Sequence, residues 1–525
     1  MKELCISYKR IKAAALSLLI LPTVFFLLGW VKIGFAIPFT LLIIASLVLA
    51  IRKDEDKRQL KISLKEIIVL ALVMTAWCFL TGIGGFMASK NDIFWRNPIY
   101  GDIIFKDWPV TYDGPLKGFG LSYYMGYWLV PGAFAKLFVP LGEDAAWNAG
   151  RAALLVWTAI LLFVCSLLLK VYTSAKSFRQ TLVMLLIFIF FSDMDAIALG
   201  IQTVLDNNAD LTFNNSRIFE LMTGCWQYSS MTTQLGWVFN QAIPVWIAIL
   251  LFLNEKSAKN YALIGLSTLI TSPLPLVGLV IFMLSFAGRD LYRSVKAGKG
   301  KEGIKNILSL SNILAFIGIF PPAALYITSN KAGGSFAFGL SYAMIHWKSF
   351  LAFMVASHII MVLLLFRRER LFECILLLAS FLLIPLIFIG GSASDVINYP
   401  METAVYSDFC MRASIPAIVI LMTMVIKFLF EEYDIKNNMR SLLVTLVLIL
   451  SLMAPAGEFF QCIAGTIDPA DKAFFYPYAK SDISLEEMKA SDIFPLDANG
   501  EPVKDESYFI CITDDSNFYK YLARK

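Results

Sequence analysis

Charged residues are scarce in this chain, and histidine is almost absent. Only 16% of the 525 residues are Asp, Glu, Lys or Arg, and His346 and His358 are the only histidines. Soluble globular proteins carry about 25% charged residues, so a soluble fold is excluded because it would expose too much apolar surface. Two histidines also leave no basis for a histidine-rich metal site, and a histidine-based triad is not expected.

Cysteine is used without any metal-binding spacing. The eight cysteines include no Cys-x-x-Cys pair, and three lie well inside apolar runs: Cys78, Cys165 and Cys374. Such cysteines act as small apolar side chains, so we expect no cysteine metal site. Cys462 and Cys511 lie toward the predicted outer side, where they could form a disulfide if that compartment is oxidising.

Hydrophobic residues make up 58% of the chain, and the mean hydropathy is +0.68. A helix needs about 20 apolar residues to cross a membrane. Eleven runs qualify, at residues 11–31, 34–51, 62–84, 148–172, 181–201, 237–254, 307–329, 349–366, 371–390, 413–432 and 441–465. The sequence therefore predicts an all-α polytopic membrane protein.

Two further apolar stretches differ from plain spans. Residues 261–287 contain Pro273 and Pro275, which interrupt the helical hydrogen bonds, so we predict two short helices that enter and return on one side. Residues 120–140 are rich in aromatics and contain Pro131. We predict that this stretch forms a helix lying in the membrane interface.

Lysine and arginine give the orientation, because they mark cytoplasmic loops. With these spans, the basic segments fall on one side: residues 2–10, 52–61, 170–179, 255–259, 288–305, 367–370 and 436–440. The N-terminus is then cytoplasmic, and the first span is an anchor and not a cleaved signal, since no small-residue cleavage site follows it. The outer segments are residues 85–147, 202–236, 330–348, 391–412 and the tail from 466. The net charge of +5 belongs to the cytoplasmic loops and does not indicate a nucleic-acid partner.

The outer segment 91–114 carries four aspartates, Asp92, Asp102, Asp107 and Asp113. The first two are each followed by a basic residue four positions later, which places the pair on one helix face. Asp107 and Asp113 stand next to proline and glycine, where aspartate commonly caps a turn. Two interpretations remain open: an interfacial segment whose acids pair with basic neighbours, or the edge of a catalytic site.

The interfacial interpretation makes its own structural predictions. Pro98 and Pro109 would cut the segment into short helices, and the charged neighbours would pair as Asp92 with Arg96 and Asp102 with Lys106. Three apolar side chains would face lipid: Ile99, Ile103 and Phe105.

Other outward-facing polar residues extend the candidate cavity. Asp193 and Asp195 lie inside an apolar run, where carboxylates face either a polar cavity or a structural partner. Asp408 and Arg412 stand four apart at the start of a span, where an arginine beside free N–H groups suits an anion, although an ion pair without a ligand fits equally. An aromatic and amide set suits stacking on a sugar or a position at the interface, namely Trp226, Gln227, Tyr228, Asn240 and Gln241.

The order of these elements resembles the GT-C glycosyltransferases, membrane enzymes of the mannosyltransferase and arabinosyltransferase type. An acidic residue follows a core span, and "LSYYMGYWLVPGAFAKLFVPLGEDAAWNAGR" then supplies an interfacial helix, the turn at Gly142 and Arg151 before the next span. The chain lacks the double proline of the family pattern and has Asn91-Asp92 where familiar members have Asp-Glu. The resemblance covers residues 62–465, with two extra spans ahead of it.

The resemblance implies a bundle of about 11–13 transmembrane helices in the cell membrane, with extracytoplasmic interfacial helices. Residues 1–61 would form two N-terminal helices and a basic loop, residues 62–465 the core with the catalytic loop 85–147, and residues 466–525 a small extracytoplasmic tail. It implies transfer of a sugar, with inversion, from a polyprenyl-phosphate donor to an extracytoplasmic glycan, lipid or protein. Asp92 would be the base, with Asp102 second, and Arg412 with Asp408 would hold the carrier phosphate, with Arg151 as competitor. No cofactor is specified, and a divalent cation stays open.

Two other classes are compatible with parts of the sequence. A transporter or flippase also uses broken membrane helices and buried acids like Asp193 and Asp195, but we find no internal repeat. An O-antigen ligase-like or polymerase-like enzyme would carry its main external loop late in the chain, whereas here it comes early. The tail carries no assigned chemistry, and "FYPYAK" and "YFICITDD" predict short strands in it.

Overall fold

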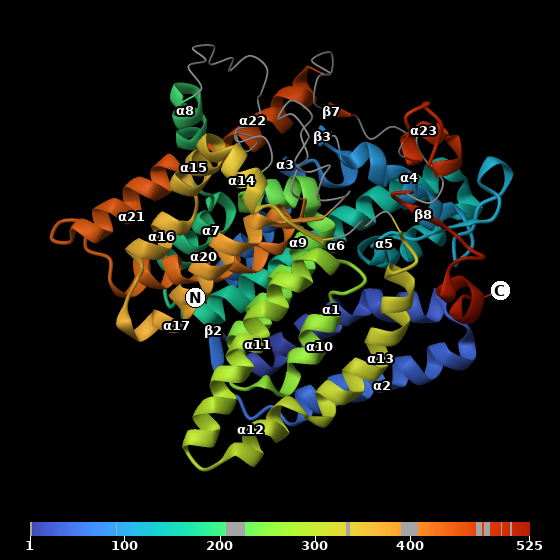
Figure 1. The fold of residues 1–525 in the computed structure, drawn as a ribbon. Helices are drawn as coiled ribbons and strands as arrows, with labels where there is room; N and C mark the ends of the chain where they lie inside the picture. Colours follow the sequence, from blue (N-terminus) through green and yellow to red (C-terminus); the bar gives the residue numbers. More distant parts are fainter. Residues whose placement is uncertain are drawn as a thin grey trace.

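The computed structural model describes residues 3–90, 92–205, 226–331, 336–389, 408–468, 475–476, 484–494, 496–503 and 507–524. This part of the chain is mostly helical (Figure 1). Nine of its helices or helix pairs are long and apolar enough to cross a membrane, Tyr8–Trp30, Ile33–Arg52, Glu143–Thr173, Phe178–Ala198, Met231–Asn254, Pro273–Lys296, Gly300–Ile327, Asp408–Glu431 and Met439–Ile467. The chain is a multi-pass membrane protein.

Helix α9 (Met231–Asn254) forms the centre of the bundle. Of its most apolar window, 94% is buried, as expected for a helix that is hydrophobic on all sides. It packs against α6 (Glu143–Thr173), α7 (Phe178–Phe190), α11 (Pro273–Lys296) and α20 (Ile415–Glu431). Every other functional element is therefore positioned relative to α9.

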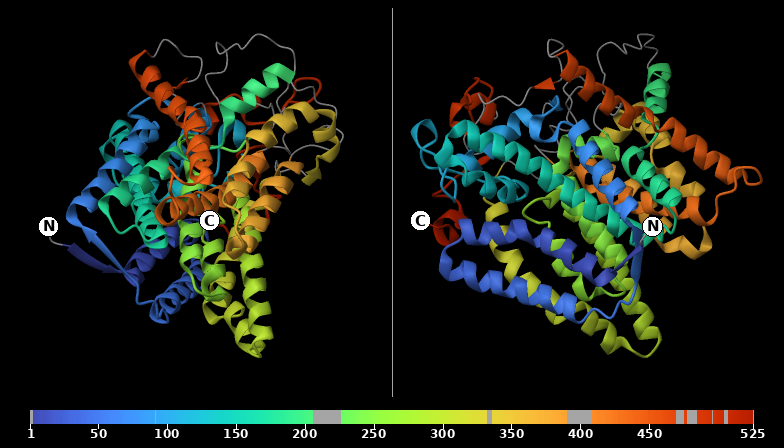
Figure 2. Two further views of the ribbon diagram at one scale, coloured as in Figure 1. Left: turned by 90° about the vertical axis from the view of Figure 1, so that its left-hand side faces the viewer. Right: turned by 180° about the vertical axis from the view of Figure 1, so that it is seen from behind.

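Helices α1 (Tyr8–Trp30), α2 (Ile33–Arg52) and α13 (Leu310–Ile327) lie side by side along one flank of the bundle (Figures 1 and 2). Helix α13 approaches α2 closely at Gly318, where an added Cβ would lie 3.0 Å from the backbone oxygen of Phe39. The Ser46 hydroxyl also donates to the backbone oxygen of Ser311 at 2.7 Å. Small residues and hydroxyl hydrogen bonds are the usual means of holding membrane helices together.

The predicted hairpin at residues 261–287 is only partly right. Helix α10 (Tyr261–Leu266) is short, and the segment returns to the side from which it entered, because the Ser309 hydroxyl after α12 (Gly300–Ile307) donates to the backbone oxygen of Lys259. The second arm, however, is the 24-residue helix α11. Pro273 is its first residue, where the missing N–H costs no hydrogen bond, so it starts the helix and does not break it.

Four predicted spans contain interruptions or end early. Residues 181–201 divide into α7 and α8 (Asp195–Leu205), residues 349–366 into α15 (Trp347–Ala356) and α16 (Ile359–Leu364), and residues 441–465 into α21 (Met439–Leu450) and α22 (Met453–Ile467). Helix α17 (Leu371–Leu383) stops before Pro385, and strand β6 (Ile387–Ile389) then pairs with β5 (Phe336–Phe338) beside α14 (Leu340–Ile345). Hydropathy alone does not register such breaks. Helix α3 (Leu64–Leu80) falls just short of full span length.

The predicted basic segments gather at one end of the molecule. Arg58 donates to Asn254 at 2.9 Å and Arg289 to Glu373 at 2.9 Å, while strand β1 (Glu3–Ser7) pairs with β2 (Gln59–Ser63). Arg370 and Arg440 both approach Glu432. The grouping of these segments is confirmed by their contacts, and we refer to this part as the basic end.

The opposite end, which the sequence predicts to be extracytoplasmic and which we call the outer end, is built from residues 85–147 and the tail together (Figure 1). Strand β3 (Ser89–Lys90) pairs with β7 (Phe475–Tyr476), and β4 (Phe119–Leu121) pairs with β8 (Ile510–Ile512). Both tail strands were predicted and are confirmed. The tail also contains α23 (Ala490–Ile493), and the backbone N–H of Arg524 donates to Trp30 at 2.9 Å. Figure 2 shows the C-terminus beside the ends of α1 and α2.

Cys462 and Cys511 are not joined by a disulfide. The Cys462 thiol lies 3.2 Å from the backbone oxygen of Ala88, to which it donates, and Cys511 is part of β8. Burial raises the pKa of the Cys511 thiol to about 11, so this thiol stays neutral and unreactive at ordinary pH.

Helix α4 (Asp92–Phe105) corrects the interfacial prediction for the outer segment. Pro98 lies within α4 and does not divide it. Ile99 and Ile103 do not face lipid, since both are completely buried and Ile103 packs on Gly132 of α5 (Gly126–Lys136). The helix is thus held between α5, α6 and the tail. Its polar residues occupy fixed positions.

Candidate functional site

Two Asp-x-x-x-Arg pairs lie at the outer end of the bundle. Arg96 of α4 pairs with Asp92 at 2.8 Å, and Arg412 of α19 (Asp408–Ala413) pairs with Asp408. In both pairs the arginine is buried, with side chains 4% and 6% exposed, while the aspartates are 38% and 59% exposed. Each pair therefore offers a buried positive charge behind an accessible carboxylate. The pairing of Asp92 with Arg96 and of Asp408 with Arg412 was predicted.

The two arginines share a pair of tyrosines. Burial raises the pKa of Tyr123 well above its ordinary value and Tyr124 adds to this, while Arg96 and Arg412 both act in the opposite direction. The two phenol rings lie 3.8 Å apart between centroids. Both guanidinium groups therefore act on the same phenol, and we call Arg96, Arg412, Tyr123 and Tyr124 the two-arginine centre.

Like charges oppose each other in this centre. Burial disfavours the charged form of Arg96, and Arg412 acts in the same direction, but Asp92 and the two tyrosines outweigh them, so the pKa of Arg96 lies above its ordinary value. Both arginines thus remain charged at physiological pH. Each guanidinium is balanced by its own aspartate, and an arginine fork with a free N–H group can bind an anion as well.

Several elements fix the tyrosines and the arginines in place. The Tyr326 hydroxyl of α13 donates to the backbone oxygen of Tyr123 at 3.0 Å, and the N–H of Gly126 donates to Ile270 at 3.2 Å. Helices α11 and α19 touch through their backbones, because an added Cβ at Gly278 would lie 2.0 Å from the oxygen of Ala413. A side chain at position 278 would therefore displace the helix that carries Arg412.

Helix α9 supplies polar groups next to this centre. Arg96 Nη1 donates to the backbone oxygen of Trp237. One turn later, the Ser272 hydroxyl at the start of α11 donates to the backbone oxygen of Gln241 at 2.8 Å. Within the described residues, the side-chain amides of Asn240 and Gln241 are buried without hydrogen-bond partners, and so is Arg412 Nε. Leaving such groups unpaired costs free energy. Buried polar side chains without protein partners are typical of a site that binds a polar ligand.

A neutral ion-pair cluster supports Trp237 from its other side. Lys90 pairs with Glu458 of α22 at 2.6 Å and donates to Gln461 at 3.2 Å, while Trp237 Nε1 donates to Glu458 at 3.2 Å. Lys90 is 1% exposed. The sequence interpretation missed this cluster, because a lysine and a glutamate 368 residues apart carry no local pattern.

Asp102 lies away from the accessible carboxylates. It is 1% exposed, accepts a hydrogen bond from the Tyr112 hydroxyl at 2.8 Å, and lies under the tail residue Leu485. The predicted pair with Lys106 is wrong, since Lys106 pairs with Glu486 of the tail at 3.1 Å. Burial raises the pKa of Asp102 to about 7.

Arg151 donates hydrogen bonds to the backbone of a neighbouring loop. Its Nε donates to Gly84 at 2.9 Å, its Nη2 donates to Gly85, and its guanidinium stacks over Phe86 at 5.0 Å. These contacts tie the start of α6 to the segment after α3. Asp113 stands at the N-cap position before residues 114–116, but its side chain makes no capping hydrogen bond, and its N–H donates to Glu486.

Asp193 and Asp195 lie together in the break between α7 and α8. The Ser192 hydroxyl donates to Asp195 at 3.2 Å, and both carboxylates are 5% exposed. Tyr228 and His358 flank this region, with rings 5.8 Å apart. The polar residues of this break thus form a second buried group. Helix α19 contacts the segment that carries Tyr228, because its Cys410 thiol donates to the backbone oxygen of Gln227 at 3.6 Å.

The side chains of the predicted sugar-stacking residues Trp226 and Tyr228 already bond to and pack against other residues of the protein. Trp226 Nε1 donates to the backbone oxygen of Pro385 at 2.9 Å, and the Tyr228 hydroxyl donates to Phe381 at 2.7 Å. Both side chains are buried among aromatic rings. Asn240 and Gln241 are the members of the predicted set whose side chains remain without partners in the described structure.

Among the residues the structure describes, no three His, Cys, Asp or Glu side chains lie close enough together to hold a metal ion. The accessible carboxylates Asp92 and Asp408 are each matched by an arginine. The charges of the two-arginine centre are therefore balanced within the chain.

No family model, curated protein or solved structure matches this chain. The function must therefore be argued from the site. One local signal could have identified both halves of the centre together, because "DIFWR" and "DFCMR" share the Asp-x-x-x-Arg spacing.

Proposed function

We propose that this chain is a membrane glycosyltransferase that moves a sugar from a polyprenyl-phosphate donor to an extracytoplasmic acceptor. The observation that carries the proposal is the two-arginine centre, where two buried guanidinium groups stand behind the accessible carboxylates Asp92 and Asp408. Transfer from a lipid phosphosugar needs a base for the acceptor and positive charge for the leaving phosphate. This arrangement supplies both.

In the proposed reaction, Asp92 accepts the proton of the acceptor hydroxyl as its oxygen attacks the anomeric carbon. The bond between that carbon and the phosphate oxygen breaks, and its electron pair leaves with the polyprenyl phosphate. The sugar carbon is attacked from the side opposite the phosphate, so its configuration inverts. A positioned base of this kind contributes roughly 10² to 10⁴ in rate.

Arg412 would stabilise the charge that develops on the phosphate, while Arg96, which pairs with Asp92 at 2.8 Å, would hold the base in place. Arginine suits this role because its planar fork can bind two phosphate oxygens at once. Arg412 Nε is buried without a hydrogen-bond partner in the described structure, and it therefore offers a donor to a ligand. Gln241 offers additional donor and acceptor groups close to the start of α11.

The test is binding and turnover in Arg412 variants of the purified protein. Arg412→Ala should weaken binding of the polyprenyl-phosphate sugar about ten- to a hundredfold, since a hydrogen bond to a charged group is worth roughly 1.5–3 kcal/mol. Arg412→Lys should recover part of this, because lysine keeps the charge but not the fork. Arg179→Ala, an exposed arginine on the basic end, is the matched control. Unchanged binding and turnover in Arg412→Ala would contradict the proposal.

The second candidate function is transport or flipping of a lipid-linked or small polar solute. The interrupted helix at Asp193 and Asp195 favours it, because transporters build midplane sites from broken helices. The two proposals differ in bond chemistry. Movement of an intact solute into sealed vesicles, without cleavage of any lipid-linked sugar supplied, would support the transporter and reject the transferase.

A further inference from the structure

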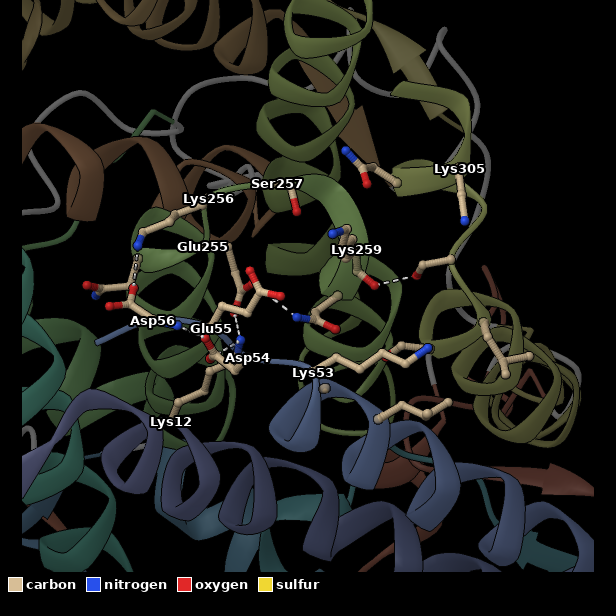
Figure 3. Close-up of a pocket in the computed structure, with 18 of the residues that line it drawn as sticks. Lys12, Lys53, Asp54, Glu55, Asp56, Glu255, Lys256, Ser257, Lys259 and Lys305 are labelled. Atoms are coloured by element: carbon tan, nitrogen blue, oxygen red, sulfur yellow. Dashed lines mark hydrogen bonds and ion pairs between the residues drawn. The ribbon is translucent and has the colours of Figure 1, made fainter. Parts of the chain in front are cut away.

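A cavity of about 750 Å³ lies at the basic end of the molecule (Figure 3). This volume is in the range of small-molecule and cofactor sites, roughly 300–1,000 Å³. Its walls come from the first turn of α1, the last turn of α2, the segment between α9 and α10, and helix α12. The cavity is thus separate from the two-arginine centre at the outer end.

One half of the cavity is closed by ion pairs within the protein. Lys12 is 3% exposed and pairs with both Asp54, at 2.9 Å, and Glu255. Asp56 is engaged by Arg58 at 2.9 Å and by Lys256 at 3.4 Å. These carboxylates are matched by cations of the chain and do not call for an added cation.

The other half presents unmatched lysines from three different elements. Figure 3 shows Lys53, Lys259 and Lys305 on this side of the cavity, and none of them forms an ion pair within the described structure. Glu55 and Glu302 also line the cavity as exposed carboxylates. The free charges are therefore of both signs, with lysine in excess.

A buried hydroxyl group lies behind the cavity wall. Tyr8 lines the cavity and is 1% exposed, and its hydroxyl makes no hydrogen bond within the described residues. This hydroxyl is closed off from the open part of the cavity, so it belongs to the buried wall and is assigned no contact with a ligand.

One part of the wall is apolar and belongs to membrane helices. Leu308 and Leu310, at the start of α13, are 62% and 53% exposed, and Leu49 and Ala50 at the end of α2 line the cavity beside them. Both helices are long and apolar enough to cross a membrane. The cavity therefore lies where charged residues meet the lipid-facing surface of α2 and α13.

We propose that this cavity binds the head group of a membrane phospholipid that carries a phosphate and a free amine. The phosphate lies among Lys53, Lys259 and Lys305, and the amine faces Glu55 and Glu302. The acyl chains leave past Leu308 and Leu310. This proposal is independent of the chemistry at the outer end.

Native mass spectrometry of the detergent-purified protein tests it, with added phosphatidylethanolamine or phosphatidylglycerol. We expect one phosphatidylethanolamine to be retained at least several-fold better than phosphatidylglycerol. The triple variant Lys53→Ala/Lys259→Ala/Lys305→Ala should lose this retention, while Lys301→Ala, an exposed lysine of α12 that does not line the cavity, should keep it. Equal retention in the triple variant and the wild type, or a preference for phosphatidylglycerol, would overturn the assignment.

Two further measurements secure the result. Glu55→Gln/Glu302→Gln removes the two carboxylates assigned to the amine and should abolish the preference for phosphatidylethanolamine over phosphatidylglycerol; an unchanged preference would count against the proposal. Soluble phosphoethanolamine shares the recognised chemistry. If it saturates the cavity and displaces the lipid at equal concentration, the site belongs to a soluble phosphate ester and not to a lipid.

Discussion

The carboxyl group of Asp102 is expected to make docking of the tail depend on pH. Burial raises the pKa of Asp102 from 3.8 to about 7, although the hydrogen bond from Tyr112 acts in the opposite direction. Because the pKa is raised in the docked state, the favourable contribution is fully present below pH 3.8 and is lost as the pH rises to about 7. Above pH 7 docking carries the full cost of a buried carboxylate.

The size of this effect follows from the two pKa values. Each pH unit between 3.8 and about 7 corresponds to 1.36 kcal/mol, so the total cost is about 4 kcal/mol if the carboxyl group is fully hydrated when the tail is detached. The docking equilibrium would then change by up to about a thousandfold. The N–H of Leu485 reports on it directly, since it lies 3.4 Å from Asp102 Oδ2.

Hydrogen exchange at Leu485, corrected for intrinsic exchange rates, measures this equilibrium between pH 5 and 8. In the wild type, protection should fall as the pH approaches 7. Asp102→Asn keeps an oxygen that accepts from Tyr112 but removes the charge, so its protection should be independent of pH and exceed that of the wild type at pH 8. Asp113→Asn, at an exposed aspartate of the same loop, is the control. Protection that is flat with pH in the wild type would refute the reasoning.

Three further predictions concern the site and the topology. Asp92→Asn should abolish sugar transfer per folded molecule, because loss of a base costs rate, and it should also lower stability, because the buried Arg96 loses its ion-pair partner; a fully active variant would move the base to another residue. Arg151→Ala should lower the thermal stability by roughly 1–3 kcal/mol, because the carbonyls of Gly84 and Gly85 lose their donor, and an unchanged unfolding temperature in detergent would contradict this. Single cysteines in residues 85–147 should react with an impermeant thiol reagent in intact cells, while those in 290–305 should not, and the reverse pattern would invert the proposed orientation.

The membrane fold was predictable because it rests on composition. Apolar runs of about 20 residues have few alternatives to a helix in lipid, and the basic segments that separate them do meet at one end of the structure. The interruptions were not predictable in the same way. The breaks before α8 and before α16 meet each other, since the N–H of Met194 donates to the backbone oxygen of Ala356 at 3.0 Å, and a hydropathy window carries no information on such a contact.

The candidate site shows the same division between local and distant information. The ion pair of Asp92 with Arg96 follows from helical spacing and was predicted. The neighbourhood of Arg96 and Arg412 depends on how α4, α11 and α19 pack, and nothing within either motif specifies it. Asp102 has the same spacing to Lys106 that Asp92 has to Arg96, yet Lys106 pairs with Glu486 of the tail instead. Spacing alone therefore did not distinguish the pair that forms from the pair that does not.

The pairing of β4 with β8 sets an order of events during synthesis. Residues 119–121 must wait for residues 510–512, and at about 5–20 residues per second a delay of almost 400 residues lasts roughly 20–80 s. During that time Asp102 has no cover from residues 484–486, so it stays hydrated and charged. Residues 510–512 thus close a region that left the ribosome almost 400 residues earlier, and any defect in docking the tail would leave this end of the molecule unfinished even when every membrane helix has been inserted.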